Sequence, residues 1–220
     1  MSEAKQAILS RIRESIAYNA HIPNETTMYT NTLQLQGEDL LENFKTNHTN
    51  NKAIVVETQK SQLENTLNEI LEQNATNNRQ VLYNPDVEAN MHSLSSFEMI
   101  AYTKSIDSMR DMLFGITTSV VQARCGIADL GIIALSSSPN APRLSSLITN
   151  TCIYLLSKDN IVPHLFAGIE FVKAYEKQRS KSDILPSNII FVAGPSRTAD
   201  IELQTVFGVH GPRKTYVILY

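Results

Sequence analysis

The chain has 220 residues, 42% of them hydrophobic, and its 19 basic and 22 acidic side chains give a net charge of −3. This length suits one large domain or one domain with an appendage, and the apolar content is sufficient for a full core. No basic stripe with interleaved aromatic residues is present, which argues against nucleic-acid binding. The apolar runs are far shorter than the ~20 residues of a membrane helix, and the N-terminus lacks a signal-peptide core, so we expect a cytoplasmic protein.

Cys125 and Cys152 are the two cysteines, and neither has a partner at metal-ligand spacing. We therefore do not expect this chain alone to hold an iron–sulfur cluster or a structural zinc ion. A disulfide is not expected in the cytoplasm either.

The N-terminal quarter reads as an extension. Apolar residues at helical spacing predict a helix over residues 3–17, and residues 20–37 read as a loop or arm because they contain Pro23 and no clean period. The stretch "EDLLENFKTN" predicts a second helix. We assign residues 1–50 to an N-terminal helical extension or arm and residues 51–220 to an α/β domain. An arm of this kind is also suited to forming a homo-oligomer.

A β–α–β unit follows. Residues 53–57 form a short apolar strand, "SQLENTLNEILEQ" has leucines at helical spacing, and residues 77–84 predict a turn and another strand. Ser61 and Glu64 resemble a capping box at the start of the helix. This order is typical of a parallel sheet with helices packed on it.

The central part contains two further buried strands. A helix is predicted to break at Gly115, and an almost purely apolar strand lies within residues 126–139, as expected for a strand covered on both faces. A turn with a short helix then leads to the strand at residues 151–157.

The C-terminal part predicts a helix that begins with Pro163, where proline is tolerated at the first position. A strand at residues 188–192 leads into the turn Gly194–Pro195, a helix from about Thr198 to Gly208, and a final strand over residues 214–220. The predicted fold class is α/β, a three-layer sandwich with a mostly parallel sheet flanked by helices.

The stretch "AGPSRTADIELQTVFGVHG" (193–211) concentrates polar chemistry after an apolar strand. If a helix begins near Thr198, its first N–H groups, Ser196 and Arg197 form a cradle for a carboxylate or phosphate. Alternatively, Ser196 or Thr198 caps the helix, Asp200 complements its dipole, and Arg197 pairs with a nearby carboxylate. The sequence leaves both interpretations open.

Three more residues have two interpretations each. His210 is either a hydrogen-bonding loop residue or an acid–base group. Asp129 is either a general base or a structural acceptor, since burying a lone carboxylate is costly. Arg143 is either a second anion contact or a solvated loop residue. His164 is expected to be structural. The motifs of serine hydrolases and nucleotide-binding loops are absent.

Two long segments carry a family resemblance. "GPSRTADIELQTVFGVHGPRKTYVILY" (194–220) closely resembles the closing signature of the lactate utilization protein C family, also called LUD-domain proteins. "GIADLGIIALSSSPNAPRLSSLITNTCIYLLSKDNIVPHL" (126–165) resembles the central block of that family. The resemblance covers about residues 114–220. Leu130 and Ile132 stand where hydroxyl residues are common in the family, which reduces any polar ligand contacts there.

The resemblance implies a fold similar to the NagB/RpiA/CoA-transferase superfamily and to 5-formyltetrahydrofolate cyclo-ligase. It also implies a non-redox component of a system that oxidises L-lactate to pyruvate, with lactate utilization proteins A and B as iron–sulfur partners. In that arrangement the partners carry the redox centres, and this chain binds no cofactor itself. The alternatives are a free-standing enzyme of the CoA-transferase or cyclo-ligase type and a module that binds a small anionic metabolite.

The positions matching the family's signatures are the candidate site residues. Asp129 and His210 are the candidate catalytic pair. The candidate ligand-binding residues are Gly131, Arg143, Gly194, Pro195, Ser196, Arg197, Thr198, Asp200, Glu202 and Gly211.

Overall fold

The computed structural model describes residues 3–18, 39–75, 79–199 and 205–220. The chain divides into two compact units, Met1–Thr32 and Leu33–Tyr220. The first unit contains helix α1 (Glu3–Tyr18), which confirms the predicted N-terminal helix and buries none of its side chains.

The second unit is an α/β domain, as predicted. Its helices are α2 (Leu40–Asn50), α3 (Leu63–Asn74), α4 (Ile106–Gly115) and α5 (Leu165–Ser180). Its strands are β1 (Ile54–Glu57), β2 (Gln80–Tyr83), β3 (Glu98–Ala101), β4 (Thr118–Gln122), β5 (Cys125–Ile127), β6 (Ile132–Ser136), β7 (Thr151–Leu156), β8 (Ile161–Val162), β9 (Ile189–Val192), β10 (Arg197–Ala199), β11 (Thr205–Phe207) and β12 (Lys214–Leu219).

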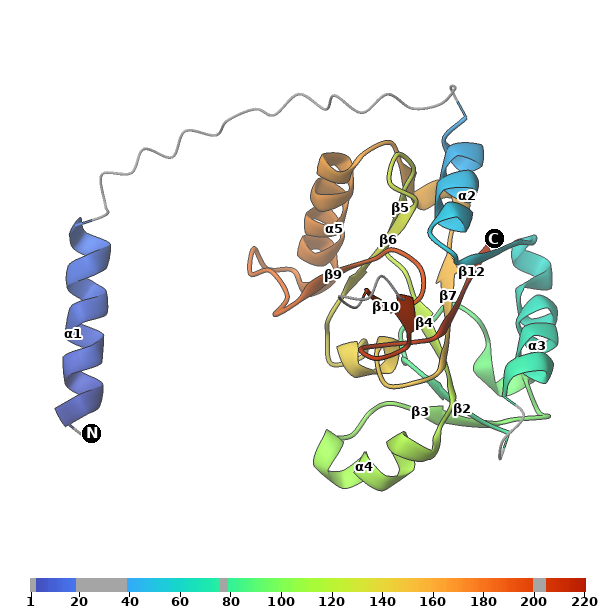
Figure 1. Cartoon of the computed structure of the whole chain (residues 1–220), viewed down its shortest axis with the longest axis horizontal. Coiled ribbons are helices and arrows are strands. Elements are labelled where there is room, and N and C mark those ends of the chain that lie inside the picture. Colours follow the sequence, from blue (N-terminus) through green and yellow to red (C-terminus); the bar gives the residue numbers. More distant parts are fainter. Residues whose placement is uncertain (1–2, 19–38, 76–78, 200–204) are drawn as a thin grey trace. The chain divides into compact units, whose positions relative to one another are not determined.

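The main sheet has six strands in the order β1-β12-β7-β4-β2-β3, and every neighbouring pair is parallel (Figure 1). All six residues of β7 are buried, and so are the last five of β12. Their sequences, "TCIYLL" and "KTYVIL", are almost continuously apolar because both faces of the sheet are covered.

Helix α3 covers one face of this sheet. Leu63, Leu67 and Leu71 recur every four residues, so they share one side of the helix and are buried there. They form one core cluster with sheet residues that include Val120, Ile153 and Ile218. The predicted β–α–β unit is therefore confirmed.

The opposite face is covered by α2 and by a second sheet with the strand order β8-β5-β6-β9. Phe44 of α2 is fully buried against this face. Helix α5 packs on the outer side of the second sheet, so α3 and α5 lie on opposite sides of the domain (Figure 1). The apolar strand predicted within residues 126–139 is β6, and it runs antiparallel to β5 and β9 in this second sheet.

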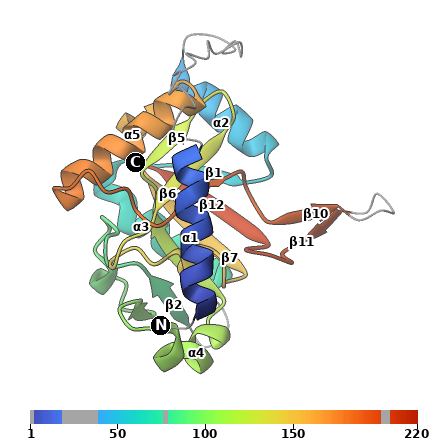
Figure 2. The ribbon, with the colours of Figure 1, turned by 90° about the vertical axis from the view of Figure 1, so that its left-hand side faces the viewer.

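The prediction of a helix from Thr198 to Gly208 is wrong. The described residues there form an antiparallel ribbon in which Arg197 pairs with Phe207 and Thr198 with Val206. Figure 2 shows β10 and β11 extending away from the two sheets. Thr, Val and Phe at 205–207 favour a strand, and the Gly208 N–H donates to the Ser196 carbonyl at 2.9 Å across the ribbon.

Two predicted helix starts are also corrected. Helix α5 begins at Leu165, after Pro163, and His164 is its N-cap because its Nδ1 accepts from the Ala167 N–H at 3.2 Å. The capping box at Ser61 and Glu64 does not form. The Glu64 carboxylate instead accepts from the backbone N–H of Asn90 at 2.8 Å.

A buried histidine holds α2 on the second sheet. His48 is 1% exposed, and its Nδ1 donates to the carbonyl of Gly131 at 2.6 Å. Its Nε2 has no hydrogen-bond partner in the described part of the chain. Burial lowers the pKa of His48, although the hydrogen bond to Gly131 opposes this effect.

Because the pKa of His48 is lowered in the folded state, we expect the stability of the domain to decrease in acid. Below about pH 6.5 the unfolded chain takes up the proton first, since the folded-state pKa is lower, so the free energy of unfolding should fall as the pH decreases. Urea unfolding at pH 7 to 5 should show a smaller loss for His48→Asn than for the wild type. His92→Asn, at an exposed position, is the matched control. Equal losses in the wild type and His48→Asn would contradict the assignment.

Candidate functional site

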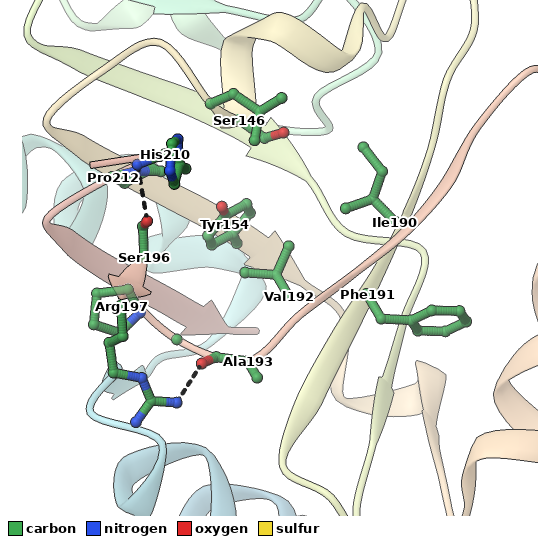
Figure 3. A pocket seen from close by; sticks show the side chains of 14 residues that line it. Ser146, Tyr154, Ile190, Phe191, Val192, Ala193, Ser196, Arg197, His210 and Pro212 are labelled. Carbon is green, nitrogen blue, oxygen red and sulfur yellow. Dashed lines mark hydrogen bonds between the residues drawn. The ribbon is translucent and has the colours of Figure 1, made fainter. Parts of the chain in front are cut away.

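A cavity of about 350 Å³ lies beside the Gly194–Arg197 loop. It is lined by residues from four stretches of chain that are distant in sequence. These are Ser146 and Leu147, Tyr154 of β7, residues 190–197, and residues 210–212. Figure 3 shows the side chains of the first, second and fourth stretches around the space beside β9.

Gly194 shapes the loop that borders the cavity. Its φ is +73°, and a Cβ at this position would lie 2.2 Å from the carbonyl oxygen of Asn51 at the end of α2. Only glycine allows both the left-handed backbone and this close approach. The loop is therefore seated on α2.

Ser196 joins the two halves of the cavity wall. Its N–H donates to the Pro212 carbonyl at 2.9 Å, and its Oγ accepts from the His210 N–H at 3.3 Å (Figure 3). These bonds hold the loop before β10 against the loop after β11. The candidate site residues Ser196 and His210 are thus in direct contact.

Arg197 and His210 supply the polar chemistry. Both are exposed, and Arg197 Nη2 donates to the Ala193 carbonyl at 3.2 Å. This bond bends the guanidinium back beside the loop, where it can attract an anion. His210 adds an imidazole, the side chain best suited to proton transfer near neutral pH.

The opposite wall is apolar. Ile190 and Val192 point toward the cavity, whereas Phe191 points the other way, as strand alternation requires (Figure 3). Tyr154 is 1% exposed, and its ring closes the inner side. Its hydroxyl has no hydrogen-bond partner within the described residues and lies beside the Cys152 thiol.

Other predicted site residues lie elsewhere. Thr198 belongs to β10, and Asp200 and Glu202 lie outside the described residues. Arg143 donates to Asn188 at 2.9 Å and borders a separate space of about 10 Å³. The structure therefore brings together Gly194, Pro195, Ser196, Arg197, His210 and Gly211.

Asp129 and Gly131 form the turn between β5 and β6, which is held by α2. Asn47 Nδ2 donates to the carbonyls of Ala128 at 2.9 Å and Asp129 at 3.2 Å, and Asn51 Nδ2 donates to the carbonyl of Gly131 at 2.9 Å. Neither Asp129 nor Gly131 lines the cavity that His210 borders. The contacts of this turn are those of a structural element.

The sequence did not reveal a buried charged network at the second sheet. Arg124 is 2% exposed and immediately precedes β5. It donates to Asp86 and, through Nε at 2.8 Å, to Ser136 Oγ. Ser136 in turn donates to Glu176 of α5 at 2.6 Å, and Glu176 accepts from Arg179. Arg124 is the one charged residue in the mostly apolar stretch "VVQARCGI", and this was the available signal in the sequence.

This network has unmet hydrogen-bonding capacity. Arg124 Nη1, Asp86 Oδ1 and Ser137 Oγ lack partners among the residues described. Burial raises the pKa of Asp86, although Arg124 opposes this effect. Burial alone would raise the pKa of Glu176, but hydrogen bonds from Arg179 and Ser136 lower it. Arg124 and Ser137 line an adjoining space of about 10 Å³, which has room for one water molecule as a partner for these two side chains.

The thiols are unsuited to metal binding or nucleophilic attack. Burial raises the pKa of Cys125 to about 12 and that of Cys152 to about 11. Thiolates are the reactive form, so both cysteines are inert at neutral pH. No group of three or more potential metal ligands occurs in the described ranges.

The LUD domain profile matches residues 41–220, which is most of the chain. The chain belongs to the LUD domain family. A crystal structure of a DUF162 family protein from Deinococcus radiodurans has a similar fold, with a TM-score of 0.58 and 18% sequence identity. The match covers 82% of this LUD domain chain and 95% of that one.

The chain spans about half the length of most of the curated relatives that it matches. An uncharacterized protein of Neisseria meningitidis is 35% identical over 56% of this chain and 51% of its own. A protein named lactate utilization protein C from Geobacillus sp. is 35% identical over 53% of this chain and 46% of its own. Lactate utilization protein C of Anoxybacillus flavithermus is 26% identical over 97% of this chain and 98% of its own.

No helix in the described part of this LUD domain protein has the length and apolar character required to span a membrane.

The glycine in the β5–β6 turn provides a test of its structural role. Gly131 has φ +58°, and a Cβ there would lie 2.2 Å from the backbone carbon of Asn47. Gly131→Ala should lower the free energy of unfolding by at least about 2 kcal/mol, measured by urea denaturation. Gly115→Ala is the matched control, because no atom lies within 4 Å of its added Cβ. A Gly131→Ala variant as stable as Gly115→Ala would refute the role of this turn.

Proposed function

We propose that this LUD domain protein is a non-redox component of a lactate utilization system that oxidises L-lactate to pyruvate. Relatives named lactate utilization protein C support this role. In the proposed system, iron–sulfur partner proteins carry the electrons, and this chain binds a small carboxylate metabolite in the cytoplasm.

One observation carries the ligand-binding part of the proposal. The family's closing signature contributes Ser196, Arg197 and His210, and all three lie at one cavity. The positive charge of Arg197 attracts a carboxylate, and His210 can donate a hydrogen bond or a proton to an oxygen of the ligand. The apolar wall opposite them suits the carbon skeleton of an organic acid.

A binding experiment tests the role of Arg197. Calorimetric titration with pyruvate and L-lactate should show at least a tenfold loss of affinity in Arg197→Ala, because the anion loses its charge-assisted partner. The melting temperature should change little, since the Arg197 hydrogen bond to Ala193 is exposed. Arg110→Ala, an exposed arginine on α4, is the control. Unchanged affinity with a large drop in melting temperature would make Arg197 a structural residue.

A genetic experiment tests the pathway. Deletion of the gene should abolish growth of the producing organism on L-lactate as the sole carbon source, and the wild-type gene should restore it. The tagged protein should co-purify with cysteine-rich partners that show iron–sulfur absorption. Normal growth of the deletion strain on lactate would reject the proposed function. Turnover of an acyl-CoA or a formyl-folate by the purified chain would instead establish the CoA-transferase-like or cyclo-ligase-like alternative.

A further inference from the structure

The cavity beside the Gly194–Arg197 loop is large for a three-carbon acid. Its volume of about 350 Å³ falls within the roughly 300–1,000 Å³ range of pockets that enclose ligands much larger than lactate. A ligand as small as lactate would leave most of the apolar wall uncovered. The size of the cavity therefore bears on which acids it prefers.

The polar and apolar groups are on separate sides of the cavity. Arg197 and the His210 imidazole belong to the two exposed loops that Ser196 ties together. Ile190 and Val192 project from β9 on the other side, and the buried ring of Tyr154 lies next to Val192 (Figure 3). A ligand that satisfies both sides has an anionic end and an apolar body.

The apolar wall is held rigidly by the core. Ile190 and Val192 pack against the buried cluster between the two sheets, and their strand pairs with β6 through Leu135 and Ile133. Because this wall is fixed, it cannot close around a short ligand. Contact with it has to come from the ligand's own carbon skeleton.

From this arrangement we infer that the cavity selects carboxylates with a longer apolar chain or an aromatic side chain. The residues that determine specificity are Ile190 and Val192 of β9 and Leu147, which lines the same cavity from the segment before β7. Lactate and pyruvate are weak ligands of the same site. The inference rests on the proposed function only in requiring that the cavity binds a carboxylate next to Arg197.

The test is a calorimetric titration of the full chain with a series of 2-hydroxy acids. The series runs from L-lactate through 2-hydroxybutyrate and 2-hydroxyhexanoate to 3-phenyllactate. Each added methylene that contacts the wall should improve the affinity about fourfold, until the chain fills the cavity. Equal or decreasing affinity along the series would overturn the inference.

Two variants locate the selective wall. Leu147→Ala and Val192→Thr should weaken binding of the longest acids severalfold while affecting L-lactate little, because they remove apolar contact or add a hydroxyl there. Leu185→Ala is the matched control, since Leu185 is 48% exposed, compared with 42% for Leu147, and does not line this cavity. The melting temperature of each variant is measured in parallel. The binding data for Val192→Thr are used only if the melting temperature of this variant equals that of the wild type. Leu147→Ala provides the decisive result, because Leu147 is exposed.

The outcomes separate the two proposals. Binding that increases with chain length and depends on Leu147 and Arg197 supports both. Binding of lactate as tight as that of the longer acids retains the carboxylate site but refutes the selectivity. Binding of no acid in the series, or chain-length dependence unaffected by Leu147→Ala, refutes the assignment to this cavity.

Discussion

The rest of the domain depends on the burial of β7 and β12 on both faces. These two parallel strands lie side by side in the middle of the main sheet, and they supply apolar side chains to the cluster under α3 and to the cluster under the second sheet. A strand buried on both faces has no solvated side where polar groups can be placed. The polar groups of the candidate site therefore lie in the loops at the ends of the strands, and the candidate cavity forms between these loops and β9.

The sequence predicted most of the α/β layout because that layout depends on local periodicity. Leu63, Leu67 and Leu71 identify a helix by their spacing, and the apolar run of β7 identifies a covered strand. The prediction at Thr198–Gly208 was wrong because Thr205, Val206 and Phe207 pair with Ala199, Thr198 and Arg197 in an antiparallel ribbon. The spacing of apolar residues within one segment does not encode its pairing with another segment. The second sheet was missed for the same reason, since β6 has the apolar character of any buried strand.

The sequence predicted only those residues of the candidate site that lie within one continuous family signature. The residues from Gly194 to Arg197, together with His210 and Gly211, are close in sequence and lie together at the cavity. Tyr154, Ile190 and Ser146 complete its lining from other segments, and nothing in their local sequence distinguishes them from ordinary core residues. The charged network of Arg124, Asp86 and Glu176 is likewise assembled from three separate segments.

One residue at the end of α2 connects two regions that are far apart in sequence. The Asn51 side chain donates to the carbonyls of Leu130 and Gly131, and its backbone carbonyl is the atom against which Gly194 is seated. The turn after β5 and the loop beside the cavity therefore share a single support. Substitutions in these two regions should be thermodynamically coupled, because each changes the position of the same peptide group. A phenotype caused by a change in the turn is then no proof that the turn itself touches a ligand.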